Sequence, residues 1–364
     1  MQVTPCQGAN FFWRYLPLEV FLRTGVILFH RLALIVTVLL GFVRPAWADN
    51  PFGVMLWPNP AISDLSMALA RGAGLGVAWF RPPAVQIPGW KPGQTCVECR
   101  TYARSSLKLA LTVRNAAAPG RASTPPSDLA AYKAVLGSIL DTWKPGLLVV
   151  EYEENLAAYY TARDPAKDYG RQLAAACEVA HARSIPCTNG GLSYEAVALL
   201  AWLTTVEHGG NDRACDFARR ALYRKGDPQA GARFCARDGT ARLDNKDSAD
   251  RLAEARALLE VYRTSAIDAV NFHWYGHDAA ALSETADLLA RLTGKAVLST
   301  EIGQRRWDGD PSRVRPLLRA AFAAGLRTAI WFSLDTPATV SLFNADGTLS
   351  PAGVEFSKQM FGKR

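Results

Sequence analysis

The sequence predicts an α/β fold, a closed (β/α)8 TIM barrel with a helical insertion between its fifth and sixth strands. After residue 50, short apolar runs alternate with longer amphipathic ones, and eight of the short runs are present. Such alternation is typical of repeated βα units, and near-continuous apolar strands are typical of parallel strands buried on both faces. Eight units within about 310 residues fit the size of a closed barrel of this kind.

The predicted strands are separated by segments with helical periodicity. Apolar residues recur at intervals of three and four in the segments between them, as on one face of a helix. The expected helices are residues 127–143, 167–183, 279–292 and 311–324. The expected strands are residues 52–57, 76–81, 107–113, 147–153, 184–188, 269–274, 296–301 and 328–333.

The connection between the fifth and sixth strands is unusually long. It runs over residues 189–267, roughly 80 residues where about 30 suffice for one unit. Its middle, residues 211–246, is rich in Arg, Asp and Gly and carries two cysteines. Because connections that follow strands leave at the carboxyl end of the barrel, we expect this inserted helical subdomain to lie over the barrel mouth.

Residues 1–48 have the order of a secretory signal peptide. Arginines precede an apolar run at residues 32–43, and small residues at 46–48 offer a cleavage site. The run of about 12 residues is shorter than the ~20 that cross a bilayer as a helix. We therefore expect export to the periplasm or the extracellular space, with a mature domain of residues 49–364 that has no stable membrane span. An uncleaved N-terminal anchor is the alternative.

The cysteine count indicates disulfides. Six of the seven cysteines lie beyond residue 48, and an even number in an exported chain is typical of disulfide bonding. A zinc or redox interpretation of the first two is disfavoured because no second Cys-x-x-Cys is present. Sequence proximity favours the pairs Cys96–Cys99, Cys177–Cys187 and Cys215–Cys235.

The charge pattern disfavours a nucleic-acid partner. The formal net charge is +8, with lysines and arginines scattered among acidic residues. Proteins that bind nucleic acids usually gather basic residues on one face or stripe. Affinity for anionic glycans or membrane surfaces is a further option for a chain of this charge.

Carboxylates stand at the ends of two predicted strands. The fourth strand leads into Glu151, Glu153 and Glu154, and the seventh leads into Glu301. Active sites of this fold lie at the carboxyl ends of the strands, and a carboxylate at the end of an apolar strand is costly unless it has a use. Two such groups facing each other about 5–5.5 Å apart suit a retaining glycosidase.

We predict that Glu153 and Glu301 are this pair of carboxylates. Glu151 and Glu154 are the competitors of Glu153. Strand alternation would place Glu151 on the same side as Glu153 and one step deeper, as a supporting buried carboxylate.

These motifs resemble those of a large clan of TIM-barrel retaining glycoside hydrolases, the cellulase-like and β-xylosidase-like clan A glycosidases. Val-Glu-Tyr-Glu-Glu-Asn at residues 150–155 is similar to the clan's Asn-Glu-Pro-Asn acid/base motif. Ser-Thr-Glu-Ile-Gly at residues 299–303 is similar to its Thr-Glu-Phe-Gly nucleophile motif. This alignment makes Glu153 the acid/base and Glu301 the nucleophile. The resemblance spans nearly all of residues 52–360 and implies a site that needs no cofactor and no metal.

The resemblance also implies residues that bind substrate. His273 and Tyr275 match a His-x-Tyr whose tyrosine orients the nucleophile, and Arg81 matches an arginine that keeps the nucleophile ionised. Trp331 matches an aromatic platform under the sugar, with core packing as the alternative. Tyr152 is a departure, because the clan has an Asn there that holds the sugar 2-hydroxyl.

Asn115 is a further candidate to line the cleft, because it ends the predicted third strand.

The expected function is that of an exported retaining glycoside hydrolase that cleaves a β-linked oligosaccharide, polysaccharide or glycoside. The alternative is a non-catalytic glycan-binding or exopolysaccharide-assembly protein on the same scaffold, which Tyr152 favours. A TIM-barrel metalloenzyme is disfavoured because no His-x-His follows the first strand and only five histidines are present.

Overall fold

A closed barrel of parallel strands forms the centre of the domain. The computed structural model describes residues 50–56, 64–222, 227, 229–243, 245–305, 309–335 and 340–361. The expected signal peptide at residues 1–48 and the end of the first predicted strand, Trp57, lie outside these ranges. Within them, the barrel strands are β1 (Phe52–Met55), β2 (Trp79–Arg81), β4 (Lys108–Arg114), β5 (Leu147–Val150), β6 (Cys187–Asn189), β7 (Ala269–Trp274), β8 (Ala296–Gly303) and β9 (Ala329–Phe332).

The ring closes through parallel pairing of neighbouring strands. β1 pairs with both β2 and β9, and β2 also pairs with β4, so the sheet returns on itself. The short strand β3 (Val85–Gln86) pairs with the end of β4. The predicted (β/α)8 barrel is confirmed.

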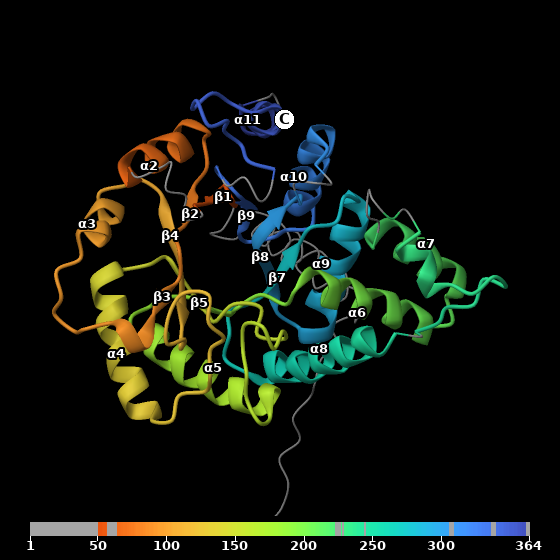
Figure 1. Ribbon diagram of the computed structural model, residues 1–364, viewed down its shortest axis with the longest axis horizontal. Helices are drawn as coiled ribbons and strands as arrows, with labels where there is room; N and C mark the ends of the chain where they lie inside the picture. Colours follow the sequence, from red (N-terminus) through yellow and green to blue (C-terminus); the bar gives the residue numbers. More distant parts are fainter. Residues whose placement is uncertain are drawn as a thin grey trace, which may run out of the picture. The chain divides into compact units, whose positions relative to one another are not determined.

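Helices surround the strands, as Figure 1 shows. Several begin at a side chain that accepts from free backbone N–H groups: Asp128 accepts from the N–H groups of Ala130 and Ala131, a common N-cap arrangement. The helices are α2 (Leu65–Gly74), α3 (Val97–Ala103), α4 (Leu129–Trp143), α5 (Pro165–His181), α6 (Tyr194–Glu207), α7 (Asn211–Ala221), α8 (Lys246–Thr264), α9 (Ala279–Thr293), α10 (Val314–Ala323) and α11 (Pro351–Phe361). None of the helices in the described ranges is both long enough and apolar enough to cross a membrane.

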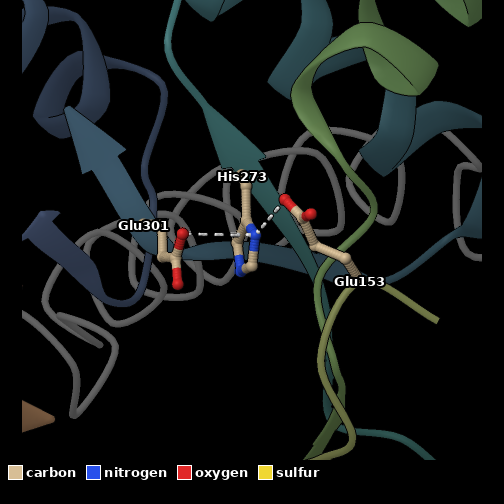
Figure 2. A group of neighbouring side chains, drawn as sticks. All are labelled: Glu153, His273 and Glu301. Atoms are coloured by element: carbon tan, nitrogen blue, oxygen red, sulfur yellow. Dashed lines mark hydrogen bonds and ion pairs between the residues drawn. The ribbon is translucent and has the colours of Figure 1, made fainter. Parts of the chain in front are cut away.

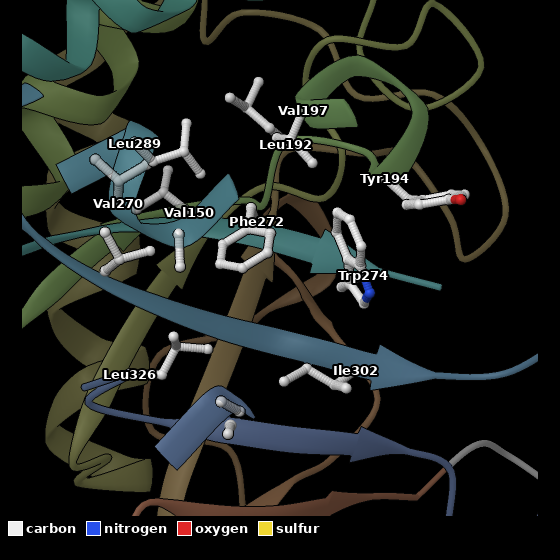
Figure 3. Packing of buried hydrophobic residues seen from close by; sticks show 14 of the residues in the cluster. Val150, Leu192, Tyr194, Val197, Val270, Phe272, Trp274, Leu289, Ile302 and Leu326 are labelled. Carbon is white, nitrogen blue, oxygen red and sulfur yellow. The ribbon is translucent and has the colours of Figure 1, made fainter. Parts of the chain in front are cut away.

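The buried apolar side chains form two layers because alternate residues of a strand face opposite sides. The outer layer fills the space between strands and helices. Figure 3 shows part of it, where Phe272 and Trp274 of β7 lie among side chains that include Val197 of α6 and Leu289 of α9. The inner layer fills the barrel and consists of Met55, Trp79, Ala110, Leu147, Val149, Ala269, Leu298, Ile330 and Phe332.

The long connection between β6 and β7 contains α6, α7 and α8. Helix α7 packs against α6 and α9, which are outer helices of the barrel. Near the end of α7, Arg220 forms a 2.9 Å ion pair with Asp278, the N-cap residue of α9. The insertion is helical as expected, and the apolar face of α7 with Ala214 and Phe217 is buried. That the insertion lies over the barrel mouth stays a prediction.

Three disulfides are present among the described residues, and they are the pairs that sequence proximity favours. Cys96–Cys99 lies at the start of α3. Cys177–Cys187 joins α5 to β6. Cys215–Cys235 joins α7 to the segment that follows it.

Candidate active site

Glu301 faces the barrel interior because β8 is irregular. Leu298 belongs to the inner layer and Ile302 to the outer one, although residues four apart on a regular strand share a face. The pairing of β8 with β9 shifts between Ser299 and Ile302, and an irregularity of this kind re-aims side chains. The side chain of Glu301 is fully buried.

A guanidinium holds one oxygen of Glu301 in place, and two phenols hold the other. Oε1 accepts a 2.6 Å hydrogen bond from Nη1 of Arg81. Arg81 is itself fixed by a 3.0 Å bond from its Nε to Oγ1 of Thr112 on β4. Oε2 accepts from the hydroxyls of Tyr275 at 2.5 Å and Tyr152 at 3.3 Å. Arg81, Tyr152 and Tyr275, all predicted site residues, therefore meet at the predicted nucleophile.

These partners keep Glu301 ionised. Burial by itself raises the pKa of Glu301. Attraction to Arg81 and hydrogen bonds from Tyr275 and Arg81 oppose burial, and the pKa of Glu301 lies below its ordinary value. Burial and the charge of Glu301 raise the pKa of Tyr275 and Tyr152 well above the usual range. Both phenols therefore stay protonated and donate hydrogen bonds to Glu301.

The chain turns sharply after β5, which ends at Val150 and not at residue 153 as predicted. Glu151 and Glu153 both have positive φ, 69° and 39°, values that residues other than glycine rarely adopt. Strand alternation therefore does not extend past Val150, and the prediction that the two carboxylates share a side is wrong. Oε1 of Glu153 lies 2.9 Å from Nδ1 of His273, whereas Glu151 points towards α5.

Glu151 is a buried structural carboxylate. Its Oε1 accepts from Nε2 of Gln172 at 2.6 Å and from the backbone N–H of Asn115 at 2.8 Å. Burial raises the pKa of Glu151 in spite of these bonds. The side-chain amide of Asn115 donates to the carbonyl of Thr124 at 2.7 Å. Asn115, predicted to line the cleft, thus uses its amide N–H to hold its own loop.

Glu154, the other competitor, is enclosed behind the site. It is fully buried and accepts from the hydroxyl of Tyr262 and, at 3.0 Å, from Nδ2 of Asn189. Burial, only partly offset by these hydrogen bonds, raises the pKa of Glu154 to about 7. Neither contact turns it towards Glu301.

Glu153, His273 and Glu301 converge on one point (Figure 2). One oxygen of each carboxylate and a ring nitrogen of His273 lie within 4.8 Å of one another, and all three residues are buried. Nδ1 of His273 lies between the carboxylates, 2.9 Å from Glu153 and 3.6 Å from Glu301. Such a donor set can in principle hold a metal ion, but Arg81 and two phenols already occupy the oxygens of Glu301.

Trp331 is a core residue and not a platform at the mouth. Its side chain is fully buried, its ring packs against Phe356 of α11, and its Nε1 donates to the carbonyl of Val340. The next residue, Phe332, belongs to the inner layer and lies edge-on to Tyr275, with ring centroids 6.0 Å apart. Phe332 is therefore the aromatic residue of β9 that faces the site.

Sequence reasoning missed two polar residues that support the site. Asn271 and Thr300 are fully buried on neighbouring strands and bond to each other. Polar side chains within otherwise apolar barrel strands are the signal that would have pointed to them.

Solved structures similar to this chain are TIM-barrel glycoside hydrolases. A GH30 endoxylanase from Clostridium papyrosolvens aligns with a TM-score of 0.50 and 13% identity, covering 86% of this chain and 72% of that one. The enzyme XacCel5A aligns with a TM-score of 0.50 and 12% identity, covering 85% and 98%. A β-mannanase from Thermomonospora fusca, in complex with mannohexaose, gives 0.48 and 13%, covering 86% and 89%.

At these identities the likeness establishes the shared fold. No protein-family profile matches the chain, and no curated protein sequence matches it.

Proposed function

We propose that this protein is an exported retaining glycoside hydrolase that cleaves a β-linked glycan or glycoside by double displacement. The observation that carries the proposal is the convergence of Glu153 and Glu301 at the carboxyl ends of β5 and β8, with oxygens within 4.8 Å. Retaining enzymes hold their carboxyls about 5–5.5 Å apart, whereas inverting enzymes leave about 6.5–9.5 Å for a water molecule.

The reaction uses the two carboxylates in turn. Glu301, held ionised by Arg81 and the phenols, attacks the anomeric carbon while Glu153 transfers its proton to the leaving oxygen. The covalent glycosyl-enzyme on Glu301 is then hydrolysed by water, whose proton passes to Glu153. Tyr275 keeps Oε2 of Glu301 aimed, and Phe332 offers an apolar ring beside the reacting sugar.

Export is part of the same proposal. Three disulfides are typical of proteins that mature outside the cytosol, and the signal-like pattern of residues 1–48 agrees with it.

The proposal is tested on the mature protein with a panel of aryl β-glycosides and β-linked oligosaccharides. An active substrate identifies the sugar, and its 2-deoxy-2-fluoro analogue is then used as a label. Peptide mass spectrometry should find the label on Glu301, and Glu301→Gln should be folded, unlabelled and inactive. A label on another carboxylate would refute the assignment.

The role of Glu153 is tested separately. Glu153→Ala should slow substrates with poor leaving groups by 10²–10⁴-fold, and azide should restore turnover of substrates with good leaving groups. Glu154→Ala is the matched control, and azide should have no such effect on it. Rescue in Glu154→Ala instead of Glu153→Ala would move the acid/base role.

A non-catalytic glycan-binding protein is the second candidate, and one contact favours it. Tyr152 stands where related motifs have an asparagine, and its hydroxyl lies 3.3 Å from Glu301. Binding of an oligosaccharide by calorimetry, without turnover or labelling across the panel, would establish this function in place of the first.

A further inference from the structure

A chain of buried hydrogen bonds leads to Glu153, the proposed acid/base. Which group donates and which accepts at each step follows from the orientation of the side-chain amide of Asn271. Oδ1 of Asn271 accepts from the backbone N–H of Thr300 at 2.9 Å. A backbone N–H can only donate, so the other end of the amide is its NH2 group. That group donates to Oγ1 of Thr300 at 2.8 Å and to the carbonyl of Asn189 at 3.1 Å.

The hydroxyl of Thr300 extends this hydrogen-bond chain to His273. Its Oγ1 already accepts from Asn271, and Nε2 of His273 lies 3.2 Å from it. The backbone of Gly191, whose φ is 103°, lies close to the ring, since a Cβ there would lie 2.3 Å from Nε2. A buried hydroxyl proton without an acceptor is costly. The hydroxyl therefore donates to Nε2.

We propose that Asn271 and Thr300 fix the tautomer of His273, and that His273 thereby determines which oxygen of Glu153 carries the transferable proton. A neutral imidazole that accepts at Nε2 carries its hydrogen on Nδ1. Nδ1 lies 2.9 Å from Oε1 of Glu153 (Figure 2). The N–H donates to Oε1, so the acidic proton of Glu153 resides on Oε2.

The catalytic consequence rests on the proposed function. In the first step the O–H bond at Oε2 of Glu153 breaks and its proton joins the leaving oxygen, while the new carboxylate keeps the hydrogen bond from His273. In the second step Oε2 takes a proton from the attacking water. The opposite tautomer would present a lone pair at Nδ1, which would accept the proton of Glu153 and withdraw it from the substrate. Asn271, Thr300 and His273 are thus positioning residues.

The tautomer is measurable without turnover. The mature protein is labelled with 15N-histidine, the signals of His273 are assigned by their loss in His273→Gln, and long-range 1H–15N spectra are recorded. We expect a protonated Nδ1 and a lone pair at Nε2. A proton on Nε2 alone, or on both nitrogens at the pH of activity, would overturn the proposal.

Asn271→Asp should reverse donor and acceptor along the hydrogen-bond chain with almost no change in side-chain volume. A carboxylate oxygen in place of the NH2 group would accept the hydroxyl proton of Thr300, leaving Oγ1 to accept from Nε2–H, so the proton of His273 should move to Nε2. Asn155→Asp is the matched control. Asn155 makes the same pair of bonds, to the N–H and hydroxyl of Ser193, both at 2.9 Å. It should leave the tautomer unchanged.

Two variants within the hydrogen-bond chain distinguish a positioning role from a purely structural one. Asn271→Asp should lower kcat about tenfold for substrates with poor leaving groups, and little for those that need no general acid. Thr300→Ser keeps the hydroxyl and should retain both the Nδ1–H tautomer and the activity. Asn271→Asp retaining Nδ1–H would contradict the proposal.

The two proposals fail differently. A protein with Nδ1–H that hydrolyses no glycoside would refute the glycosidase and leave the tautomer chain standing. An active glycosidase with Nε2–H would refute the tautomer chain alone.

Discussion

Arg81 and Glu301, separated by 220 positions in the sequence, form a 2.6 Å ion pair inside the barrel. The side chain of Arg81 is 2% exposed and that of Glu301 is not exposed at all. Removing one member of such a pair leaves an uncompensated buried charge, which typically costs about 3–5 kcal/mol. The pair therefore links the charge state of Glu301, the proposed nucleophile, to the stability of the fold.

Arg81→Met should shift the acid limb of the pH–rate profile to higher pH. In the parent, attraction to Arg81 and hydrogen bonds from Arg81 and Tyr275 oppose burial, and the pKa of Glu301 lies below its ordinary value. Without the guanidinium, burial counts for more, the pKa rises, and Glu301 ionises only at higher pH. The measurement is kcat/KM against pH, with denaturation to follow stability. Arg81→Lys, which keeps a charge, should show a smaller shift. An acid limb that does not move in Arg81→Met would contradict the assigned role of Arg81.

The two phenols on Oε2 of Glu301 should contribute unequally. A hydrogen bond to a charged group is worth about 1.5–3 kcal/mol, and the bond from Tyr275 is 2.5 Å long against 3.3 Å for Tyr152. Tyr275→Phe should lower kcat about 10- to 100-fold, and Tyr152→Phe about fivefold or less. The measurement is steady-state turnover of one aryl glycoside by both variants. The reverse order would show that Tyr152 is the main support of the nucleophile.

Glu154 should make the protein less stable as the pH rises. Its pKa is raised from 4.5 to about 7, chiefly by burial, so the folded state binds its proton more tightly than the unfolded state. The stabilisation is full below the unfolded pKa and is lost as the pH rises through the folded one, by on the order of 3 kcal/mol.

Glu154→Gln removes this dependence, because the amide oxygen can still accept from Tyr262 and Asn189. Chemical denaturation at pH 4.5 to 8 should show a smaller decline for the variant than for the parent. Equal slopes would mean that Glu154 ionises normally.

The Cys215–Cys235 disulfide should stabilise the insertion. Its cysteines are 20 residues apart, and closing a loop of this size contributes about 3 kcal/mol in the chain-entropy model. Replacing both cysteines by serine should lower the free energy of unfolding by about that amount and spare turnover of small aryl glycosides. The matched control is the double serine variant at Cys96 and Cys99, only three residues apart, where the loss should be smaller. An equal loss in both would argue against loop closure as the cause.

The sequence predicted the barrel well because its strands are buried on both faces and read as unbroken apolar runs. The same property hid the direction in which each side chain points. In Ala-Ile-Trp-Phe of β9, all four residues are buried, so nothing in the pattern distinguished Trp331, in the outer layer, from Phe332, in the inner one.

Local backbone geometry was the other limit. The positive φ values of Glu151 and Glu153 and the irregular pairing of β8 both re-aim carboxylates. Neither leaves a glycine or proline in the sequence to mark it. The pair Glu153 and Glu301 was found from its position at strand ends, whereas Thr300 and Asn271 gained meaning only once the two strands were placed side by side.

Gly190 and Gly191 have no room for a side chain. A Cβ at Gly190 would lie 2.6 Å from the carbonyl carbon of Glu151 and 2.7 Å from the backbone nitrogen of Tyr152, and one at Gly191 would overlap His273. A saturation library at these two positions should therefore return glycine almost alone among active clones. New substrate preferences would have to be selected at other positions around the site, such as Phe332.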